Sequence, residues 1–137
     1  MFKLIKIMNS GKSVPELVKL KGNINTTYRA GCVYFINDCG IIINPSLDDD
    51  HKFIPIKTTT IDEKNTTVTG YIVSEEMLFE TKHPDINEKL QVGNSYTFLR
   101  DSDGVASGIS EITGGDMKVI SIDSVDTTGK VNVVLKW

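Results

Sequence analysis

The segment Lys130–Trp137 constrains the fold most, because its side chains alternate between apolar and polar almost without a break. Every second residue is apolar, namely Val131, Val133, Leu135 and Trp137. Only Val134 breaks the alternation. A period of two is typical of a half-buried β-strand, whose successive side chains leave opposite faces of the sheet. We therefore expect the chain to end inside its own sheet, with the Trp137 indole as the last anchor.

Short apolar or alternating runs, separated by turn residues, recur along the chain. Helical periodicity is not sustained in any window, and residues 74–80 and 84–90 offer one helical turn each at most. The expected strands are Phe2–Met8, Glu16–Lys21, Val33–Ile36, Ile41–Ile43, Lys52–Lys57, Val68–Ser74, Met77–Thr81, Ser95–Leu99, Met117–Ile122 and Lys130–Trp137, with a weaker strand around Val105. About nine to eleven short strands at regular spacing predict an all-β fold, a single compact β-barrel or β-sandwich.

Turn residues predict how some of these runs are joined. Asn37–Gly40 is expected to close one hairpin and Asp126–Gly129 another, since glycine accepts the positive φ of a tight turn. Pro55 lies inside Lys52–Lys57. Proline donates no ladder hydrogen bond, so we expect that run to be an edge strand or an irregular one.

Charge argues against nucleic acid as a partner. The net charge is -3, from 15 basic and 18 acidic residues. Phosphate binding depends on clustered basic residues, but Arg29 and Arg100 are the only arginines and the lysines are scattered. No apolar run approaches the roughly 20 residues that span a bilayer, and Met1–Met8 lacks the features of a signal peptide. We expect a protein made in the cytoplasm, with neither nucleic acid nor membrane as a partner.

The chain of 137 residues is long enough to bury a core and is expected to form one domain. Residues 1–25 contain two strand-like stretches, Pro15 and two polar breaks. Two interpretations are open for this segment. It is either an extended arm that lies along a partner by strand addition, or a pair of strands of the barrel itself.

Cysteine and aspartate patterns predict no metal ligands. Cys32 and Cys39 are the only cysteines; their spacing matches no zinc motif, and both histidines lie far from them. The favoured interpretation is that both thiols are buried and reduced, and the alternative is that they form a disulfide across a hairpin. Asp48, Asp49 and Asp50 lack the alternating ligands and distal glutamate of a calcium loop, so we interpret them as part of a solvated loop.

No set of residues predicts catalysis. Gly11-Lys12-Ser13 matches the end of a phosphate-binding loop, but the motif also requires a glycine where Lys6 stands. Nucleophilic catalysis needs a nucleophile, a base and an orienting acid, and the sequence has no Gly-x-Ser-x-Gly elbow. His83, in what we expect to be a loop, is interpreted as a surface residue. We therefore expect no enzyme, no catalytic residue and no cofactor.

Four segments, in order along the chain, carry a resemblance to a known family. They are Phe2–Ile7 followed by Val14–Glu16, Val73–Thr81 with its Met-x-Phe-Glu-Thr string, Leu90–Phe98 and Gly129–Trp137. Together they resemble the small head decoration or auxiliary capsid proteins that are encoded beside the major capsid protein in tailed bacteriophages. Residues 37–66 match nothing in that family.

This resemblance implies a β-structured virion protein whose partner is the major capsid protein. Such a protein binds the outside of the assembled shell and stabilises it by mass action. Its implied location is the capsid exterior, after synthesis in the host cytoplasm. A homotrimer at three-fold positions is compatible with this role, although the sequence does not show trimerisation. The resemblance implies no catalytic residue.

Candidate capsid contacts are chosen from the segments that we expect to be exposed. Residues 44–66 and 100–116 have little to bury and are expected to be long surface loops. The N-terminal candidates are Phe2, Leu4, Ile5 and Ile7. The loop candidates are Asp48, Asp49, Asp50 and His51.

The alternative function is a ligand-binding β module that recognises a carbohydrate or a receptor. Such a module requires aromatic platforms on an exposed face. The side chains able to supply polar-tipped rings are Tyr28, Tyr34, Tyr71, Tyr96 and Trp137. A small hydrolase, a third class, would need a pocket around His51 or His83.

Overall fold

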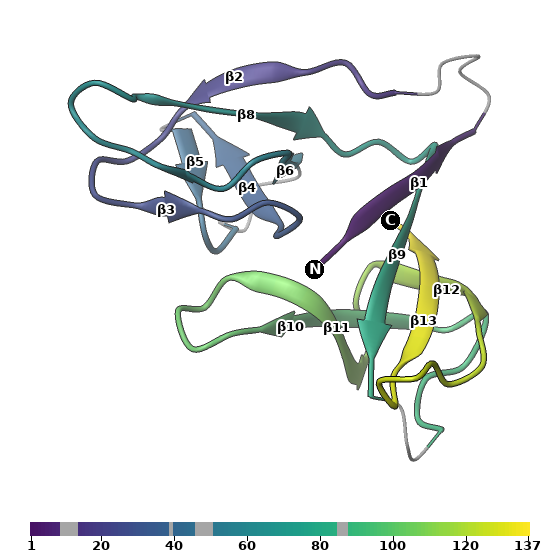
Figure 1. Cartoon of the computed structure of the whole chain (residues 1–137). Helices are drawn as coiled ribbons and strands as arrows, with labels where there is room; N and C mark the ends of the chain where they lie inside the picture. The colour runs from purple at the N-terminus through teal and green to yellow at the C-terminus, as the bar shows by residue number, and fades with distance from the viewer. Residues whose placement is uncertain (9–13, 39, 46–50, 85–87) are drawn as a thin grey trace. The chain divides into compact units, whose positions relative to one another are not determined.

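The computed structural model describes residues 1–8, 14–38, 40–45, 51–84 and 88–137, and over these residues the chain is all-β. Thirteen strands form three antiparallel sheets in this part of the chain (Figure 1). The six-stranded sheet has the order β1-β9-β13-β12-β10-β11, with bounds Lys3–Ile7, Met77–His83, Val131–Lys136, Met117–Ile122, Ser95–Arg100 and Ala106–Thr113. The five-stranded sheet has the order β2-β8-β6-β4-β5, with bounds Val18–Lys21, Thr67–Ile72, His51–Pro55, Tyr34–Asn37 and Gly40–Ile42. The third sheet pairs β3 (Thr27–Tyr28) with β7 (Thr59–Thr60).

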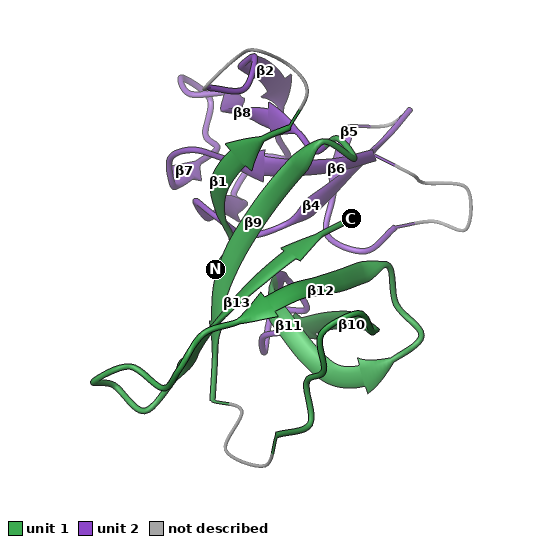
Figure 2. Cartoon of the chain, turned by 90° about the vertical axis from the view of Figure 1, so that its right-hand side faces the viewer, with its two compact units in different colours: residues 1–13, 74–99, 107–137 green, residues 14–73, 100–106 purple. Residues whose placement is uncertain are grey.

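The chain divides into two compact units, which Figure 2 shows in green and purple. Unit 1 consists of Met1–Ser13, Ser74–Leu99 and Ser107–Trp137, and unit 2 of Val14–Val73 and Arg100–Ala106. Unit 1 contains the six-stranded sheet apart from the ends of β10 and β11, and unit 2 contains the other two sheets. Neither unit is one continuous segment. The single domain expected from chain length stays a prediction.

Alternation along the strands builds the core of unit 1. In β13, Val131, Val133 and Leu135 are buried and the residues between them are half-buried, as the sequence predicts. Its neighbour β9 alternates in the same way, and Phe79 of β9 lies opposite Leu135. The strands turn strongly in direction from β9 to β11 (Figure 1), so the sheet curls.

Unit 2 is built around aromatic and branched aliphatic side chains. Tyr28, Tyr34, Phe53 and Val68 are almost fully buried in one cluster. The rings of Tyr28 and Tyr34 meet edge to face, with their centroids 5.0 Å apart, the geometry that aromatic pairs prefer. These side chains come from the two-stranded and the five-stranded sheet, so the cluster joins both.

Tyrosine hydroxyls recur as acceptors for the backbone five residues earlier. Tyr28 accepts the N–H of Asn23 at 3.0 Å, and Tyr34 accepts that of Arg29 at 2.8 Å. In unit 1, Tyr96 accepts the N–H of Gln91 at 2.7 Å. Each buried hydroxyl is thereby paired, as buried polar groups generally are, and each bond fixes the loop that leads into a strand.

Both expected hairpins are confirmed. β4 pairs with β5, and β12 pairs with β13. In the second connection Gly129 has a φ of 78°, and a carboxylate oxygen of Asp126 accepts the N–H groups of Thr128 at 2.8 Å and Lys130 at 3.1 Å. Hydrogen bonds from the Thr128 hydroxyl and then the Lys82 ammonium hold the pKa of Asp126 well below its usual range.

Pro55 lies in an interior strand, so the prediction of an edge or irregular strand is wrong. β6 lies between β8 and β4. Pro55 is the last residue of β6, opposite Gly70, and at the end of a ladder one missing N–H leaves the preceding pairs intact. Gly70 provides the space, since a Cβ there would lie 2.4 Å from the Ile54 carbonyl oxygen and 2.6 Å from the Phe53 ring.

Residues 100–116 are not the surface loop that their glycines predict. β11 covers Ala106–Thr113, and its buried residues are Ala106, Gly108, Ile109 and Ser110. A tight turn at Asp103-Gly104 folds this strand back beside β10. Pairing with a neighbour overrides the weak strand preference of glycine and serine. Within residues 44–66, β7 and the buried Ile61 likewise replace part of the expected loop.

Residues 1–25 supply an edge strand to each of the two larger sheets. β1 pairs with β9 and β2 pairs with β8. Both stretches therefore belong to the chain's own sheets, the second of the two interpretations left open by the sequence. The outer edges of β1 and β2 have no partner strand in the described segments.

Candidate functional site

β1 carries three of the predicted N-terminal contacts, and one of them, Ile5, is an exposed apolar side chain. The register between β1 and β9 shifts between Leu4 and Lys6, so Ile5 lies at a β-bulge, where it is 42% exposed. Leu4 lies opposite the buried Phe79, and Ile7 is half-buried. A bulge bends an edge strand and projects one residue out of the ladder. Ile5 is thus the exposed apolar side chain of β1.

Phe2, the fourth N-terminal candidate, belongs to the core of unit 1. It is 3% exposed. Its ring centroid lies 5.2 Å from that of Trp137 and 6.2 Å from that of Phe98. The Thr81 hydroxyl also donates to the Met1 carbonyl at 3.0 Å. These contacts anchor the start of the chain, so the expectation that Phe2 is exposed is wrong.

Polar side chains link β1, β9 and β13, with Lys3 directly opposite Glu80 and Asn132 diagonal to it. The Lys3 ammonium lies 3.3 Å from the Glu80 carboxylate, and the Asn132 amide donates to Glu80 at 3.0 Å. The hydrogen bond from Asn132, with help from the Lys3 charge, lowers the pKa of Glu80. β1 is therefore fixed to its sheet by side chains as well as by backbone pairing, while its outer edge stays unpaired among the described residues.

The loop candidates are only partly placed. Asp48, Asp49 and Asp50 lie outside the described residues. His51 is exposed and begins β6, where it lies opposite Ile36 of β4. His51 belongs to unit 2, whereas the N-terminal candidates belong to unit 1.

The tyrosines that the ligand-binding alternative requires on a surface are buried. Tyr28, Tyr34, Tyr71 and Tyr96 are each at most 5% exposed. Burial raises the pKa of Tyr71 to about 12. Trp137 is half-buried, and its ring packs against Phe2 and Phe79. These rings therefore build cores and offer no flat platform to a sugar.

His83 is buried at the end of β9, so its interpretation as a surface loop residue is wrong. Alternation along β9 places it on the same face as Phe79 and Thr81. Its Nε2 lies 4.0 Å from a carboxylate oxygen of Glu111, whose other oxygen lies 3.0 Å from the Lys89 ammonium. Its Nδ1 has no hydrogen-bond partner within the described part of the chain.

Cys32 is a buried free thiol, and burial raises its pKa against the opposing charge of Arg29. The structure therefore favours the prediction of reduced cysteines for Cys32, and Cys39 lies outside the described residues. Residues 1–8, 14–38, 40–45, 51–84 and 88–137 contain no cluster of three metal-ligating side chains. They also contain no helix long and apolar enough to cross a membrane.

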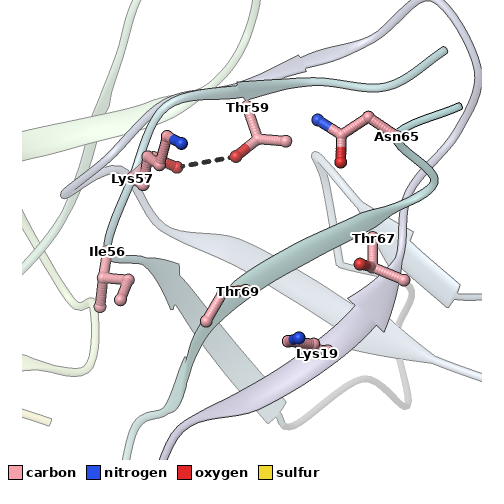
Figure 3. A pocket seen from close by; sticks show the side chains of 7 residues that line it. All are labelled: Lys19, Ile56, Lys57, Thr59, Asn65, Thr67 and Thr69. Atoms are coloured by element: carbon pink, nitrogen blue, oxygen red, sulfur yellow. Dashed lines mark hydrogen bonds between the residues drawn. The ribbon is translucent and has the colours of Figure 1, made fainter.

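A cavity on unit 2, open to solvent and with a volume of about 340 Å³, was not predicted from the sequence (Figure 3). Its polar lining consists of Lys19, Lys57, Thr59, Asn65, Thr67 and Thr69, and Ile56 adds an apolar wall. β2 and β8 bring Lys19 directly opposite Thr69. The sequence contained one indication of this cavity, the alternating polar residues of β2 and β8. The strands lie far apart in the sequence, so alternation alone does not show that they pair.

Comparison with known proteins does not identify a family for this chain. No protein-family model, curated protein or solved structure matches it.

Proposed function

We propose that this protein is a non-enzymatic structural component of a phage virion, located on the capsid exterior, which binds the major capsid protein and cements the shell. One observation carries the proposal. The segments that resemble head decoration proteins cover β1, β13 and most of β9 and β10, and these four strands belong to one sheet. The short stretch Val14–Glu16 is the exception, since it lies before β2 in unit 2. A family that shares a folded unit is expected to conserve segments that meet in space, even when they lie far apart in the sequence. The unmatched residues 37–66 fall in unit 2.

The open edge of β1 is the surface that we assign to the capsid. The backbone groups along this edge, which have no partner strand in the described part of the chain, allow a strand of a partner to add by main-chain hydrogen bonds. The exposed Ile5 side chain supplies an apolar contact at the same edge. The aromatic contacts of Phe2 and the Lys3–Glu80–Asn132 contacts hold the strand in advance. A strand that is already ordered loses less conformational entropy on binding.

The experiment is saturable co-sedimentation of the purified chain with undecorated heads, assembled from the major capsid protein encoded beside it. The wild-type chain is expected to bind at roughly micromolar concentration or tighter. Ile5→Asp places a charge at the β1 edge, and Ile120→Asp places the same charge on the interior strand β12, where Ile120 is 37% exposed. Ile5→Asp should weaken binding about tenfold or more, because a buried unpaired charge is costly.

The two variants distinguish a failure of the proposed capsid binding from a failure of the β1 edge as the contact surface. Ile120→Asp should bind like the wild type, and circular dichroism should show that both variants are folded. If the wild-type chain does not bind to the heads, the proposed function is contradicted. If Ile5→Asp binds to the heads as tightly as the wild type, the β1 edge is not the contact surface.

A further inference from the structure

The cavity on unit 2 carries positive charge in a protein of net charge -3. Lys19 comes from β2, and Lys57 comes from the segment between β6 and β7. Neither ammonium group has an ion-pair partner among the described residues, and no carboxylate lines the cavity. Both charges are therefore available to a ligand, and a ligand of negative charge fits them.

The remaining lining offers hydroxyl and amide groups. Thr67 and Thr69 are two residues apart on β8, so their side chains lie on the same face of the sheet. The Thr59 hydroxyl donates to the Lys57 carbonyl at 3.3 Å, which leaves its oxygen able to accept a hydrogen bond. The Asn65 amide donates to the Thr60 carbonyl at 3.5 Å, and its oxygen stays an acceptor. Several donors and acceptors in one place suit a ligand with many hydroxyl groups.

The arrangement of these side chains favours an extended ligand over a single ion. In Figure 3 the two lysines lie on opposite sides of the cavity, and the threonines and Asn65 lie around the space between them. The volume of about 340 Å³ falls within the range of roughly 300–1,000 Å³ that is typical of small-molecule sites. Ile56, which is 49% exposed, provides an apolar surface for the C–H face of a sugar ring.

We infer that this cavity binds an anionic oligosaccharide, a short sugar chain with sulfate, phosphate or carboxylate groups. Lys19 and Lys57 each contact one anionic group, and the threonines with Asn65 contact the hydroxyl groups between them. This site goes beyond capsid binding and does not rest on it. The buried tyrosines rule out recognition by stacking on those rings, so recognition here depends on charge and hydrogen bonds.

The test is a titration of the isotope-labelled full chain, followed by amide chemical shifts. The probe is a sulfated tetrasaccharide derived from heparin; maltotetraose is the neutral control and inorganic phosphate the single-ion control. The variants are Lys19→Gln, Lys57→Gln and the matched Lys118→Gln, whose exposed lysine lies on β12 in unit 1. The sulfated probe should shift the amides of Lys19, Lys57 and Thr69 saturably, and maltotetraose should shift them much less.

Each of the two cavity lysines should contribute to the affinity for the sulfated probe, and Lys118, outside the cavity, should not. Lys19→Gln and Lys57→Gln should each weaken binding of the sulfated probe about fivefold, the effect of one lost ion pair in a partly exposed site. Lys118→Gln should leave the affinity unchanged. Absence of saturable shifts, or equal weakening by all three substitutions, would overturn the site. Phosphate binding as tight as that of the tetrasaccharide would overturn the extended ligand.

Discussion

Arg29 and Asp101 lie 72 residues apart in the sequence and form an ion pair within unit 2. The other oxygen of Asp101 accepts the N–H groups of Asp103 at 2.9 Å and Val105 at 3.1 Å. One carboxylate therefore orders the turn after β10 and also joins it to the segment between β3 and β4. Residues 100–106 complete unit 2 through this pair, although β10 and most of β11 belong to unit 1.

The Arg29–Asp101 pair should be measurable by a double-mutant cycle. Asp101→Ala removes the ion pair and two backbone hydrogen bonds, so it should lower the free energy of unfolding by about 1–3 kcal/mol. Arg29→Ala should cost less, about 0.5–1 kcal/mol, because the Arg29 side chain is 39% exposed and its charge is screened by water. Urea unfolding of both single variants and the double variant gives the coupling energy. A coupling energy of zero would contradict the pair.

Gly70 should tolerate no side chain. Gly70→Ala would place a Cβ 2.4 Å from the Ile54 carbonyl oxygen, and we expect a loss of about 2–4 kcal/mol in the free energy of unfolding, as for an overpacked core. Gly108→Ala is the matched control, since a Cβ there would meet Leu99 at an ordinary 3.7 Å. Chemical unfolding of both variants makes the comparison. Equal effects would show that the close approach in β8 is not what requires glycine.

The Tyr96 hydroxyl should stabilise unit 1. It accepts the Gln91 N–H at 2.7 Å and donates to the Lys89 carbonyl at 3.2 Å. Tyr96→Phe leaves both backbone groups without this partner while the ring is retained, and we expect a loss of about 1–2 kcal/mol. Thermal unfolding measures the change. A melting temperature equal to that of the wild type would show that water replaces the hydroxyl at no cost.

Ionisation of the buried Tyr71 phenol should lower the free energy of unfolding at alkaline pH. Burial raises its pKa from 10 to about 12 in the folded state, so the folded protein favours the neutral phenol. This contribution to the free energy of unfolding is complete below the unfolded pKa near 10 and is lost as pH rises toward 12. Urea unfolding across this range should show a decline that Tyr71→Phe reduces. The same decline in Tyr71→Phe would assign it to other groups.

Local patterns were enough to predict the all-β class and most strands. The alternation of Val131, Val133 and Leu135 requires only that one face of a strand be buried. The turn residues at Gly129 act within four positions of the chain. Such features depend on near neighbours, so the sequence predicts them directly.

Features that depend on distant partners were missed or misinterpreted. Pro55 is accommodated because Gly70 lies opposite it. His83 is buried because β9 continues past Thr81 to pair with Val131. The cavity exists because β2 pairs with β8, which brings Lys19 beside Thr69. No local pattern contains these pairings.

The central claim is that the chain recognises an assembled capsid lattice, and one binding measurement tests it most directly. The purified chain is titrated against undecorated heads and, separately, against the same capsid protein in unassembled form, and the bound mass is measured. We expect saturable binding to heads at roughly micromolar concentration or below and at least tenfold weaker binding to the free subunits, since only the lattice-bound state stabilises a shell. Heads that sediment without the chain, or equal affinity for heads and free subunits, would contradict the account.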